Sequence, residues 1–218
     1  MPAHIGQQVD PDSVLVAVDG DVIPTSPGRV YYLLYKPPGV VSSAADTHER
    51  PIVTDLVPSD IRVYPVGRLD LDSEGLMLLT NDGYLAQRIS HPSFGITKTY
   101  VLRTSGSLGK SELAKLVAGV ELEDGPARAV SARILDRSKH ATMLEVVMAE
   151  GRNREVRRMA DAIGIPVTTL TRVAIGPLRD RNLKAGHWRE LTAREVRSLY
   201  AAGQDPENDR FKGQDGST

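Results

Sequence analysis

Three acidic side chains alternate in the stretch GRLDLDSEGLMLLTNDG, at Asp70, Asp72 and Glu74. Alternate acids followed by a glycine open many calcium loops, and a pair of carboxylates catalyses glycoside hydrolysis. A single aspartate can also act as a nucleophile, with its acidic neighbours in structural roles. A fourth interpretation is a solvated polar turn before a buried strand. The spacing alone leaves these alternatives open.

Residues elsewhere weaken two of them. A calcium loop closes its ligand shell with a glutamate at its twelfth position, which here is Asn81, and Pro65 and Gly67 stand where a helix should enter. Aromatic residues make up only 5% of the chain, with one Trp, so the usual signs of a sugar-binding cleft are missing. We therefore expect no metal, and one reactive carboxylate is the favoured chemistry.

A second informative stretch is EGRNREVRRMADAIG, residues 150–164. A helix from Arg154 would place two sets of residues on opposite faces: Val156, Met159, Ala160 and Ile163 on the apolar one, and Arg154, Arg157, Arg158 and Asp161 on the polar one. Arg152 precedes this helix and Asn153 can cap it, so positive side chains and free N–H groups converge. The stretch predicts a phosphate-binding surface for RNA, with an ordinary solvated helix face as the alternative.

Composition indicates a folded intracellular protein. The 218 residues are 40% hydrophobic and 25% charged, and they include no cysteine, which excludes disulfides and thiolate metal sites. No signal peptide or membrane-spanning segment is recognisable, so we expect the cytoplasm. The net charge is only −1, but residues 151–189 carry eight Arg and one Lys against three acids. Binding of nucleic acid would therefore be local to that region.

The elements that position these residues follow from local patterns. Strands are predicted at 14–23 and 30–41, each around a turn, and at 62–70, 76–80, 98–103, 127–134, 142–148 and 167–173. Helices are predicted at 84–90 and 111–117, and a last one follows the capping box Thr192–Glu195. Long βαβ crossovers are missing, which favours an α+β fold with a largely antiparallel sheet. Asp70 would lie in a loop between two strands.

Together, five stretches resemble the RsuA/RluB/RluE/RluF family of ribosomal RNA pseudouridine synthases. They are YYLLYKPPGVVSS (31–43), GRLDLDSEGLMLLTNDG (67–83), HPSFGITKTYVL (91–102), EGRNREVRRM (150–159) and RVAIGPL (172–178). They follow the family's order through nearly all of 30–200. HPS before KTY, together with EGRNREVRRM, is most similar to the RluB-like branch, which acts on large-subunit RNA.

The resemblance implies a pseudouridine synthase fold, a mixed sheet with flanking helices and a central catalytic cleft. The implied reaction isomerises a flipped-out uridine in ribosomal RNA to pseudouridine, without a cofactor. Asp70 corresponds to the catalytic carboxylate, Tyr100 would stack on the uracil, and Arg157 would pair with Asp70 and keep it ionised. The expected RNA contacts are Arg68, Arg152, Asn153, Arg154 and Arg158.

The resemblance also suggests a domain scheme. Residues 1–28 match only the last strands of the family's N-terminal RNA-binding module, 29–202 form the catalytic domain, and 203–218 form a polar, disordered tail. The expected partner is ribosomal RNA or a ribosomal precursor particle, bound by a monomer. A protein that keeps this fold for RNA binding or ribosome assembly without turnover is the main alternative.

Overall fold

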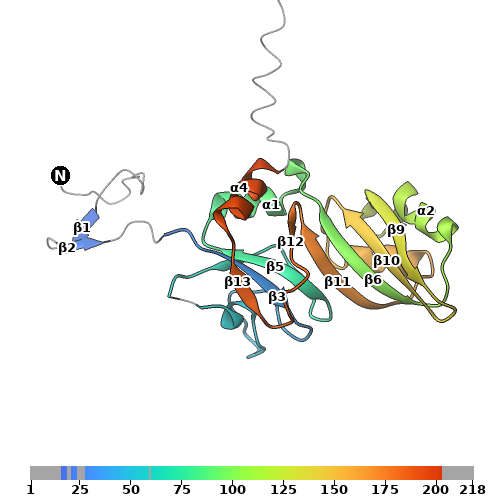
Figure 1. Cartoon of the computed structure of the whole chain (residues 1–218), viewed down its shortest axis with the longest axis horizontal. Helices are drawn as coiled ribbons and strands as arrows, with labels where there is room; N and C mark the ends of the chain where they lie inside the picture. The colour runs from blue at the N-terminus through green and yellow to red at the C-terminus, as the bar shows by residue number, and fades with distance from the viewer. Residues whose placement is uncertain (1–15, 19–20, 24–27, 59, 203–218) are drawn as a thin grey trace, which may run out of the picture.

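The computed structural model describes residues 16–18, 21–23, 28–58 and 60–202. Its main feature is a nine-stranded sheet with the strand order β13-β3-β5-β11-β6-β10-β9, to which β4 and β12 are added beside β5 and β11 (Figure 1). The strands are β3 (Tyr31–Lys36), β4 (Tyr64–Val66), β5 (Glu74–Thr80), β6 (Lys98–Ser105), β9 (Ser131–Arg137), β10 (Ala141–Met148), β11 (Val167–Ile175), β12 (Leu178–Arg179) and β13 (Trp188–Glu190).

The sheet consists of two antiparallel halves joined at one parallel pair. Strands β3, β4, β5 and β13 form one half, and β6, β9, β10, β11 and β12 form the other. The halves meet where β5 runs parallel to β11, over only two residue pairs, Thr171 with Glu74 and Arg172 with Gly75. The predicted α+β class with a largely antiparallel sheet is therefore confirmed.

Helices cover this sheet in two places. Helices α1 (Gly83–Ser90) and α4 (Ala193–Ala201) lie together over the first half, whereas α2 (Lys110–Ala118) and α3 (Glu155–Ala162) belong to the second. Two 3-10 turns, η1 (Val53–Leu56) and η2 (Pro92–Phe94), and two small hairpins, β1–β2 (Val16–Val18, Asp21–Ile23) and β7–β8 (Val120–Leu122, Gly125–Ala127), complete the described elements.

Asp82 connects the ends of three elements. Its carboxylate caps α1 by accepting a hydrogen bond from the Leu85 N–H at 3.1 Å. The same side chain accepts hydrogen bonds from the hydroxyls of Tyr31 on β3 and Tyr200 on α4. This shared acceptor fixes both helices against the sheet. The predicted capping box of the last helix is confirmed, since Thr192 accepts from the Glu195 N–H.

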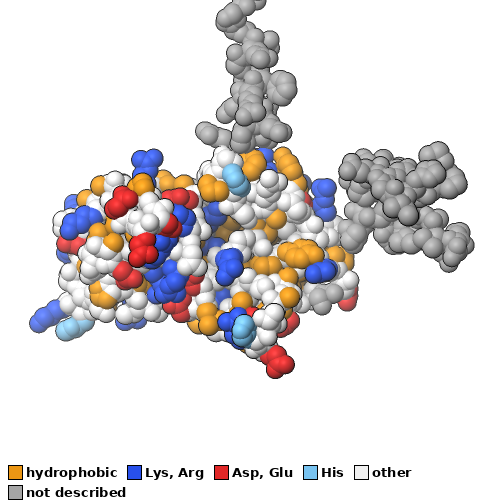
Figure 2. Space-filling view, turned by 180° about the vertical axis from the view of Figure 1, so that it is seen from behind, with side chains coloured by type: hydrophobic (Ala, Val, Ile, Leu, Met, Phe, Trp, Pro, Cys, Tyr) orange, Lys and Arg blue, Asp and Glu red, His pale blue; other side chains and the backbone are white. Residues whose placement is uncertain are grey.

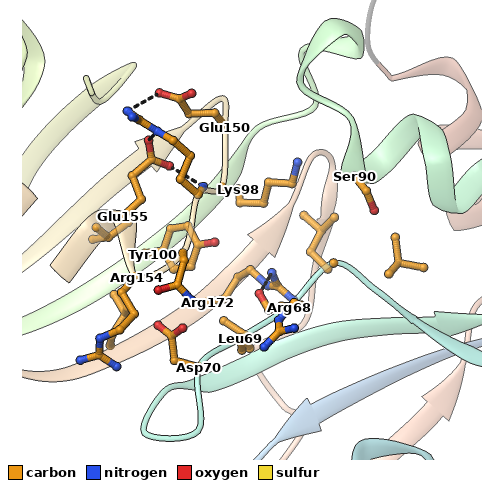
Figure 3. A pocket seen from close by; sticks show the side chains of 18 of the residues that line it. Arg68, Leu69, Asp70, Ser90, Lys98, Tyr100, Glu150, Arg154, Glu155 and Arg172 are labelled. Atoms are coloured by element: carbon orange, nitrogen blue, oxygen red, sulfur yellow. Dashed lines mark hydrogen bonds and ion pairs between the residues drawn. The ribbon is translucent and has the colours of Figure 1, made fainter. Parts of the chain in front are cut away.

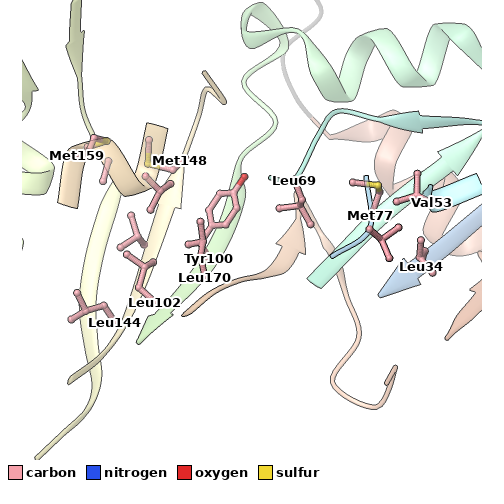
Figure 4. Packing of buried hydrophobic residues seen from close by; sticks show 14 of the residues in the cluster. Leu34, Val53, Leu69, Met77, Tyr100, Leu102, Leu144, Met148, Met159 and Leu170 are labelled. Atoms are coloured by element: carbon pink, nitrogen blue, oxygen red, sulfur yellow. The ribbon is translucent and has the colours of Figure 1, made fainter. Parts of the chain in front are cut away.

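Alternation along the strands divides the core between the two faces of the sheet. Leu33 packs with Leu85, Ile89 and Leu199 beneath α1 and α4, whereas its neighbour Leu34 belongs to a larger cluster that extends through both halves. In that larger cluster, Leu69, Tyr100 and Leu170 lie close to the place where the halves join (Figure 4). The junction is therefore packed by apolar side chains.

Some predicted boundaries are wrong. Of the two short strands expected around Pro-Pro-Gly in 30–41, only the first forms, as β3, and in place of the second Val41 forms an isolated bridge with Ile52. The strand expected at 127–134 is two strands, β8 and β9. The short strands β7, β12 and β13 were not anticipated.

The start of α3 also differs from the prediction. The helix begins at Glu155 and its N-cap is Arg154, which has a left-handed backbone with φ +48° and makes no side-chain capping hydrogen bond. Asn153 is therefore not the cap. The expected tail at 203–218 and most of the expected N-terminal remnant at 1–28 lie outside the described residues.

The parallel junction requires a glycine, which gives a testable prediction. Gly75 has φ +114°, and a Cβ there would lie 2.2 Å from the carbonyl oxygen of Arg172. We expect Gly75→Ala to lower the free energy of unfolding by about 3 kcal/mol or more, from backbone strain plus overlap with another backbone. Urea unfolding measures the loss.

Gly119 is the matched control. It has nearly the same φ, +115°, but its Cβ would meet nothing nearer than 3.6 Å. Gly119→Ala should therefore show the strain alone, about 1–2 kcal/mol. Equal losses in the two variants would mean that the approach of the two backbones is not a constraint.

Candidate active site

A cleft of about 350 Å³ lies at the junction of the two halves. Five segments line it: the end of β4 with the loop that follows, the end of α1, β6, the start of α3 with the residues before it, and β11. Figure 3 shows Asp70, Tyr100 and Arg172 around its interior, with Arg68 and Lys98 nearby. Figure 2, which shows the side opposite to that of Figure 1, has Lys and Arg side chains next to Asp and Glu side chains.

Asp70 belongs to the loop of residues 67–73, which connects β4 to β5. The loop's first part is held by the segment after β3. The buried hydroxyl of Ser42 donates to the Leu69 carbonyl at 2.7 Å and accepts from the Leu69 N–H at 3.1 Å. The Gly39 N–H donates to the Leu71 carbonyl at 2.8 Å. The residues on both sides of Asp70 are thus fixed through their backbones.

Three cationic side chains hold the rest of this loop. Lys36, which is fully buried, donates to the Ser73 carbonyl at 2.7 Å. Arg157 donates to the Asp72 carbonyl at 3.2 Å. Arg172 donates from Nε to the Leu76 carbonyl at 2.7 Å and from Nη1 to the Arg68 carbonyl at 3.4 Å. Each cation comes from a different element, so the loop's conformation depends on the tertiary fold.

The three alternating acids have separate environments. Asp70 lines the cleft, and no ion pair to it exists among the described residues. Asp72 points away to Arg154, at 3.0 Å. Glu74, already on β5, accepts a hydrogen bond from the Thr171 hydroxyl at 2.9 Å. The acids do not converge on a common point, and of the three only Asp70 lines the cleft.

Neighbouring charges affect the ionisation of Asp72 in the loop and of Lys36 behind it. Partial burial opposes ionisation of Asp72, but the hydrogen bond from Arg154 and the charges of Arg157 and Arg154 outweigh it and hold the pKa of Asp72 below its ordinary value. Behind the loop, burial lowers the pKa of Lys36 to about 8, against the opposing influence of Asp70 and Asp72. Lys36 is therefore a buried cation close to Asp70 that sequence reasoning missed, although it directly precedes Pro-Pro-Gly.

Tyr100 lies on β6, is buried, and lines the cleft. Its partner across the strand pair is Arg172 on β11, so the two side chains share one face of the sheet. Arg172 was also missed, together with Lys98 two residues before Tyr100. Arg172 is the first residue of RVAIGPL, and Lys98 is the lysine of KTY. Both stretches were recognised in the sequence, but neither residue was assigned a role.

The arginines around α3 are not a free basic surface. Arg157 is buried, contacts the Ser73 hydroxyl at 3.4 Å, and forms its ion pair with Asp72 at 3.5 Å. The helical pattern placed Arg157 on the polar face with Arg154 and Arg158, but its side chain is buried. The expected ion pair between Arg157 and Asp70 is not among those of the described residues. Arg157 faces inward because it donates to the loop instead of to solvent.

The other predicted RNA contacts differ in their availability. Arg68 and Asn153 are exposed at the cleft. Arg154 is paired with Asp72, and Arg158 forms two hydrogen bonds with Asp124, at 2.8 and 2.9 Å. Arg152 contacts Asp124, Glu155 and the carbonyls of the β7–β8 turn. Carboxylates therefore compensate three of the predicted phosphate ligands.

A loop aspartate and a buried strand tyrosine, both lining a cleft at the centre of a mixed, mostly antiparallel sheet, are the features of an RNA pseudouridine synthase. Comparison with known proteins agrees, because the family model described as RNA pseudouridylate synthase matches residues 30–162. The chain belongs to this family. It is an enzyme that isomerises uridine in RNA to pseudouridine.

Two curated relatives and a solved structure illustrate the similarity. The ribosomal large subunit pseudouridine synthase B of Bacillus subtilis is 45% identical over 184 residues, which cover 82% of this chain and 75% of that protein. An RNA pseudouridine synthase of Aquifex aeolicus is 38% identical over 91% of this chain and 80% of its own length. A crystal structure of a pseudouridylate synthase superposes with a TM-score of 0.71 at 27% identity, over 88% of this chain and 83% of that one.

The hydrogen bonds of Ser42 give a prediction for the site. Ser42→Ala leaves the buried Leu69 backbone without its partner, which should cost about 1–3 kcal/mol in the free energy of unfolding. Because Leu69 precedes Asp70, the single-turnover rate of pseudouridine formation should also fall by about tenfold or more. Unfolding in urea and single-turnover assays measure both effects.

Ser43→Ala is the control, since that neighbouring hydroxyl bonds only to the exposed backbone of Ala45, donating to its carbonyl and accepting from its N–H. It should change the free energy of unfolding by less than about 0.5 kcal/mol and leave the rate unchanged. A Ser42→Ala enzyme that matches Ser43→Ala in both measurements would show that the loop does not need this anchor.

Proposed function

We propose that the chain isomerises a specific uridine of ribosomal RNA, in the large subunit, with Asp70 as the catalytic carboxylate. The observation that supports this most strongly is that Asp70 and Tyr100 line one cleft of about 350 Å³, at the low end of the size of small-ligand sites. The Bacillus subtilis relative is named for the large ribosomal subunit, which supports the choice of RNA.

The reaction moves the sugar from one atom of the base to another. The bond between N1 of uracil and the anomeric carbon breaks, the bond from that carbon to C5 forms, the C5 proton is lost and N1 gains one. Asp70 attacks the anomeric carbon or C6 of the base, or assists elimination to a glycal. Each route uses a carboxylate that is ionised and oriented, which is consistent with a loop fixed on both sides of Asp70.

The target base must leave its stack to meet Asp70. A flipped uridine would enter the cleft and stack on Tyr100, whose ring lies at the packed junction of the sheet (Figure 4). Tyr100 is buried and therefore has little conformational freedom to lose when the base binds. We propose that it also lies near the proton lost from C5.

The arginines take two roles in this proposal. Arg157 is the basic partner of the catalytic loop, through the Asp72 carbonyl and carboxylate rather than through a direct contact with Asp70. Arg68, Arg152, Asn153, Arg154 and Arg158 contact the RNA. The partners of Arg154 and Arg158, Asp72 and Asp124, are exposed, so phosphates could replace these carboxylates without loss of a buried ion pair.

The biological setting belongs to the same proposal. The partner is ribosomal RNA or a ribosomal precursor particle, bound by a monomer in the cytoplasm. Residues 29–202 are the catalytic domain in this scheme. In the described part of the chain, no helix is long and apolar enough to cross a membrane.

The catalytic assignment is tested by two neutral substitutions in one loop. Asp70→Asn should lower pseudouridine formation by more than about 1,000-fold, because an amide is not a nucleophile. Asp72→Asn should stay within about tenfold of the wild type, since it loses its ion pairs with Arg154 and Arg157 but keeps the backbone carbonyl to which Arg157 donates. Tritium release from ribosomal RNA labelled at uridine C5 measures turnover.

The same assay separates the enzyme from an RNA-binding protein of this fold. Wild-type chain that binds ribosomal RNA but releases no tritium would contradict the proposal. An Asp72→Asn enzyme as inactive as Asp70→Asn, with its unfolding transition unchanged, would contradict the assignment of a single catalytic carboxylate.

The arginine roles predict different defects on one helix. Arg158→Ala should weaken RNA binding and reduce the log–log salt slope by up to about one unit, because one phosphate contact is lost. Arg157→Ala should instead lower the single-turnover rate at saturating RNA. Filter binding across salt concentrations and single-turnover kinetics measure the two effects.

Arg133→Ala is the control for Arg158, because Arg133 is another exposed arginine with a carboxylate partner, Glu145 at 2.7 Å, but lies on β9 at the edge of the sheet. Its salt slope should equal that of the wild type. If Arg157→Ala reacts at the wild-type rate once RNA saturates the enzyme, Arg157 has no part in positioning the loop.

A further inference from the structure

Lys98 brings a positive charge into the cleft without an anionic partner. The side chain is partly buried and lines the cleft, and its ammonium group donates to the Ile89 carbonyl at 2.7 Å. No carboxylate pairs with it among the described residues. Burial lowers the pKa of Lys98 to about 8, and the charge that lowers it further is another cation, Arg172.

Arg172 has an unused hydrogen-bond donor in the same place. Its side chain is buried, and Nε and Nη1 are occupied by the carbonyls of Leu76 and Arg68. Nη2 is buried and has no hydrogen-bond partner among the described residues, which is also true of Nε in Arg157 and Arg158, but of these three residues only Arg172 lines the cleft. Because the other two nitrogens fix the plane of the guanidinium, the direction of this free donor is fixed as well.

The two cations occupy neighbouring strands on the face that carries Tyr100. Lys98 precedes Tyr100 by two positions on β6, and Arg172 is opposite Tyr100 on β11. Residues two apart on a strand share a face, at a Cα separation of about 7 Å. Figure 3 shows both side chains around the cleft, with Tyr100 and Asp70 beside them.

Charges taken out of water in proteins are normally paired, and an unused buried donor normally has a partner. The charges of Arg154 and Arg158 are paired with the carboxylates of Asp72 and Asp124, whereas Lys98 and Arg172 have no carboxylate partner among the described residues. The missing anion must therefore come from the ligand. RNA supplies one with a full charge and several acceptor oxygens, the phosphodiester.

We propose that Lys98 and Arg172 form a subsite for a phosphate that adjoins the target uridine. The subsite deepens the proposed function and rests on it, because it places a backbone phosphate beside the base that stacks on Tyr100. It would hold the flipped nucleotide by its backbone, independently of the exposed arginines near α3. Lys98 and Arg172 are then binding residues that orient the nucleotide toward Asp70.

The test neutralises the phosphate and the lysine separately and together. The probe is a synthetic stem-loop from large-subunit ribosomal RNA that the wild-type chain converts, with one uncharged methylphosphonate either 5′ or 3′ of the target uridine. The protein variant is Lys98→Gln, whose amide can still donate to the Ile89 carbonyl. The measurement is the single-turnover rate at limiting RNA concentration.

On the unmodified stem-loop, we expect Lys98→Gln to be slower than the wild type by about tenfold or more. At one of the two methylphosphonate positions the wild type should slow by a similar factor, and Lys98→Gln should then add little further loss. Such non-additivity shows that the lysine and that phosphate interact. A merely structural Lys98 would produce the same defect on every RNA.

Two further variants complete the experiment. Lys98→Arg keeps the charge and should recover most of the rate on unmodified RNA. Lys139→Met removes a lysine from the exposed β9–β10 turn, at the end of β10 away from Lys98, and should leave the rate unchanged. Melting temperatures of all variants show whether each is folded.

The subsite is overturned if the effects of Lys98→Gln and of each methylphosphonate simply multiply at both positions, while the wild type converts the unmodified stem-loop. That result would leave the proposed function intact. If the wild type converts no ribosomal RNA at all, the proposed function fails first and the subsite with it.

Discussion

The close approach of Gly75 to the backbone of Arg172 is the constraint on which the site depends. At this point the two halves of the sheet are joined by only two parallel residue pairs, and a side chain in place of the glycine hydrogen would force them apart. The approach places the end of the loop that carries Asp70 beside β11 and brings Asp70 to the cleft that Tyr100 also lines. Asp70 and Tyr100 come from different halves of the sheet, so the geometry of the cleft depends on the packing between the halves.

Backbone carbonyls, rather than carboxylates, are the main partners of the cations nearest to Asp70. Lys36, Arg157 and Arg172 donate to the loop carbonyls of Ser73, Asp72 and Arg68, which fixes the shape of the loop without placing a counter-ion on Asp70. A carboxylate held in this way keeps its orientation before substrate arrives, and such preorganisation lowers the cost of reaching the transition state. The buried lysine is tolerated because its ammonium group has two carbonyl partners, those of Pro37 and Ser73.

The distribution of charge around the cleft explains how a protein with a net charge of −1 can act on RNA. Arg154 and Arg158 have exposed carboxylate partners, so the surface near α3 is close to neutral until phosphates arrive. Inside the cleft, Lys98 and Arg172 have no such compensation. In the proposed function, attraction for RNA is therefore concentrated in the cleft, and the arginines near α3 contribute by exchanging their carboxylate partners for phosphates.

Local patterns were sufficient for the fold class and for most of the elements, and they singled out the stretch that carries Asp70. Strand alternation, the Thr192 capping box and the run around Asp70 each depend on residues close together in the chain, where spacing carries the information.

The partners of the charged side chains could not be found in this way. Arg157 meets Asp72 across 85 positions, and Arg172 meets Leu76 across 96, so no local pattern predicts either contact. The helix starts after Arg154 instead of after Asn153, and Arg157 faces inward, because hydrogen bonds to a distant loop outweigh local preference. Only the tertiary structure could show which positive charges are compensated and which await the substrate.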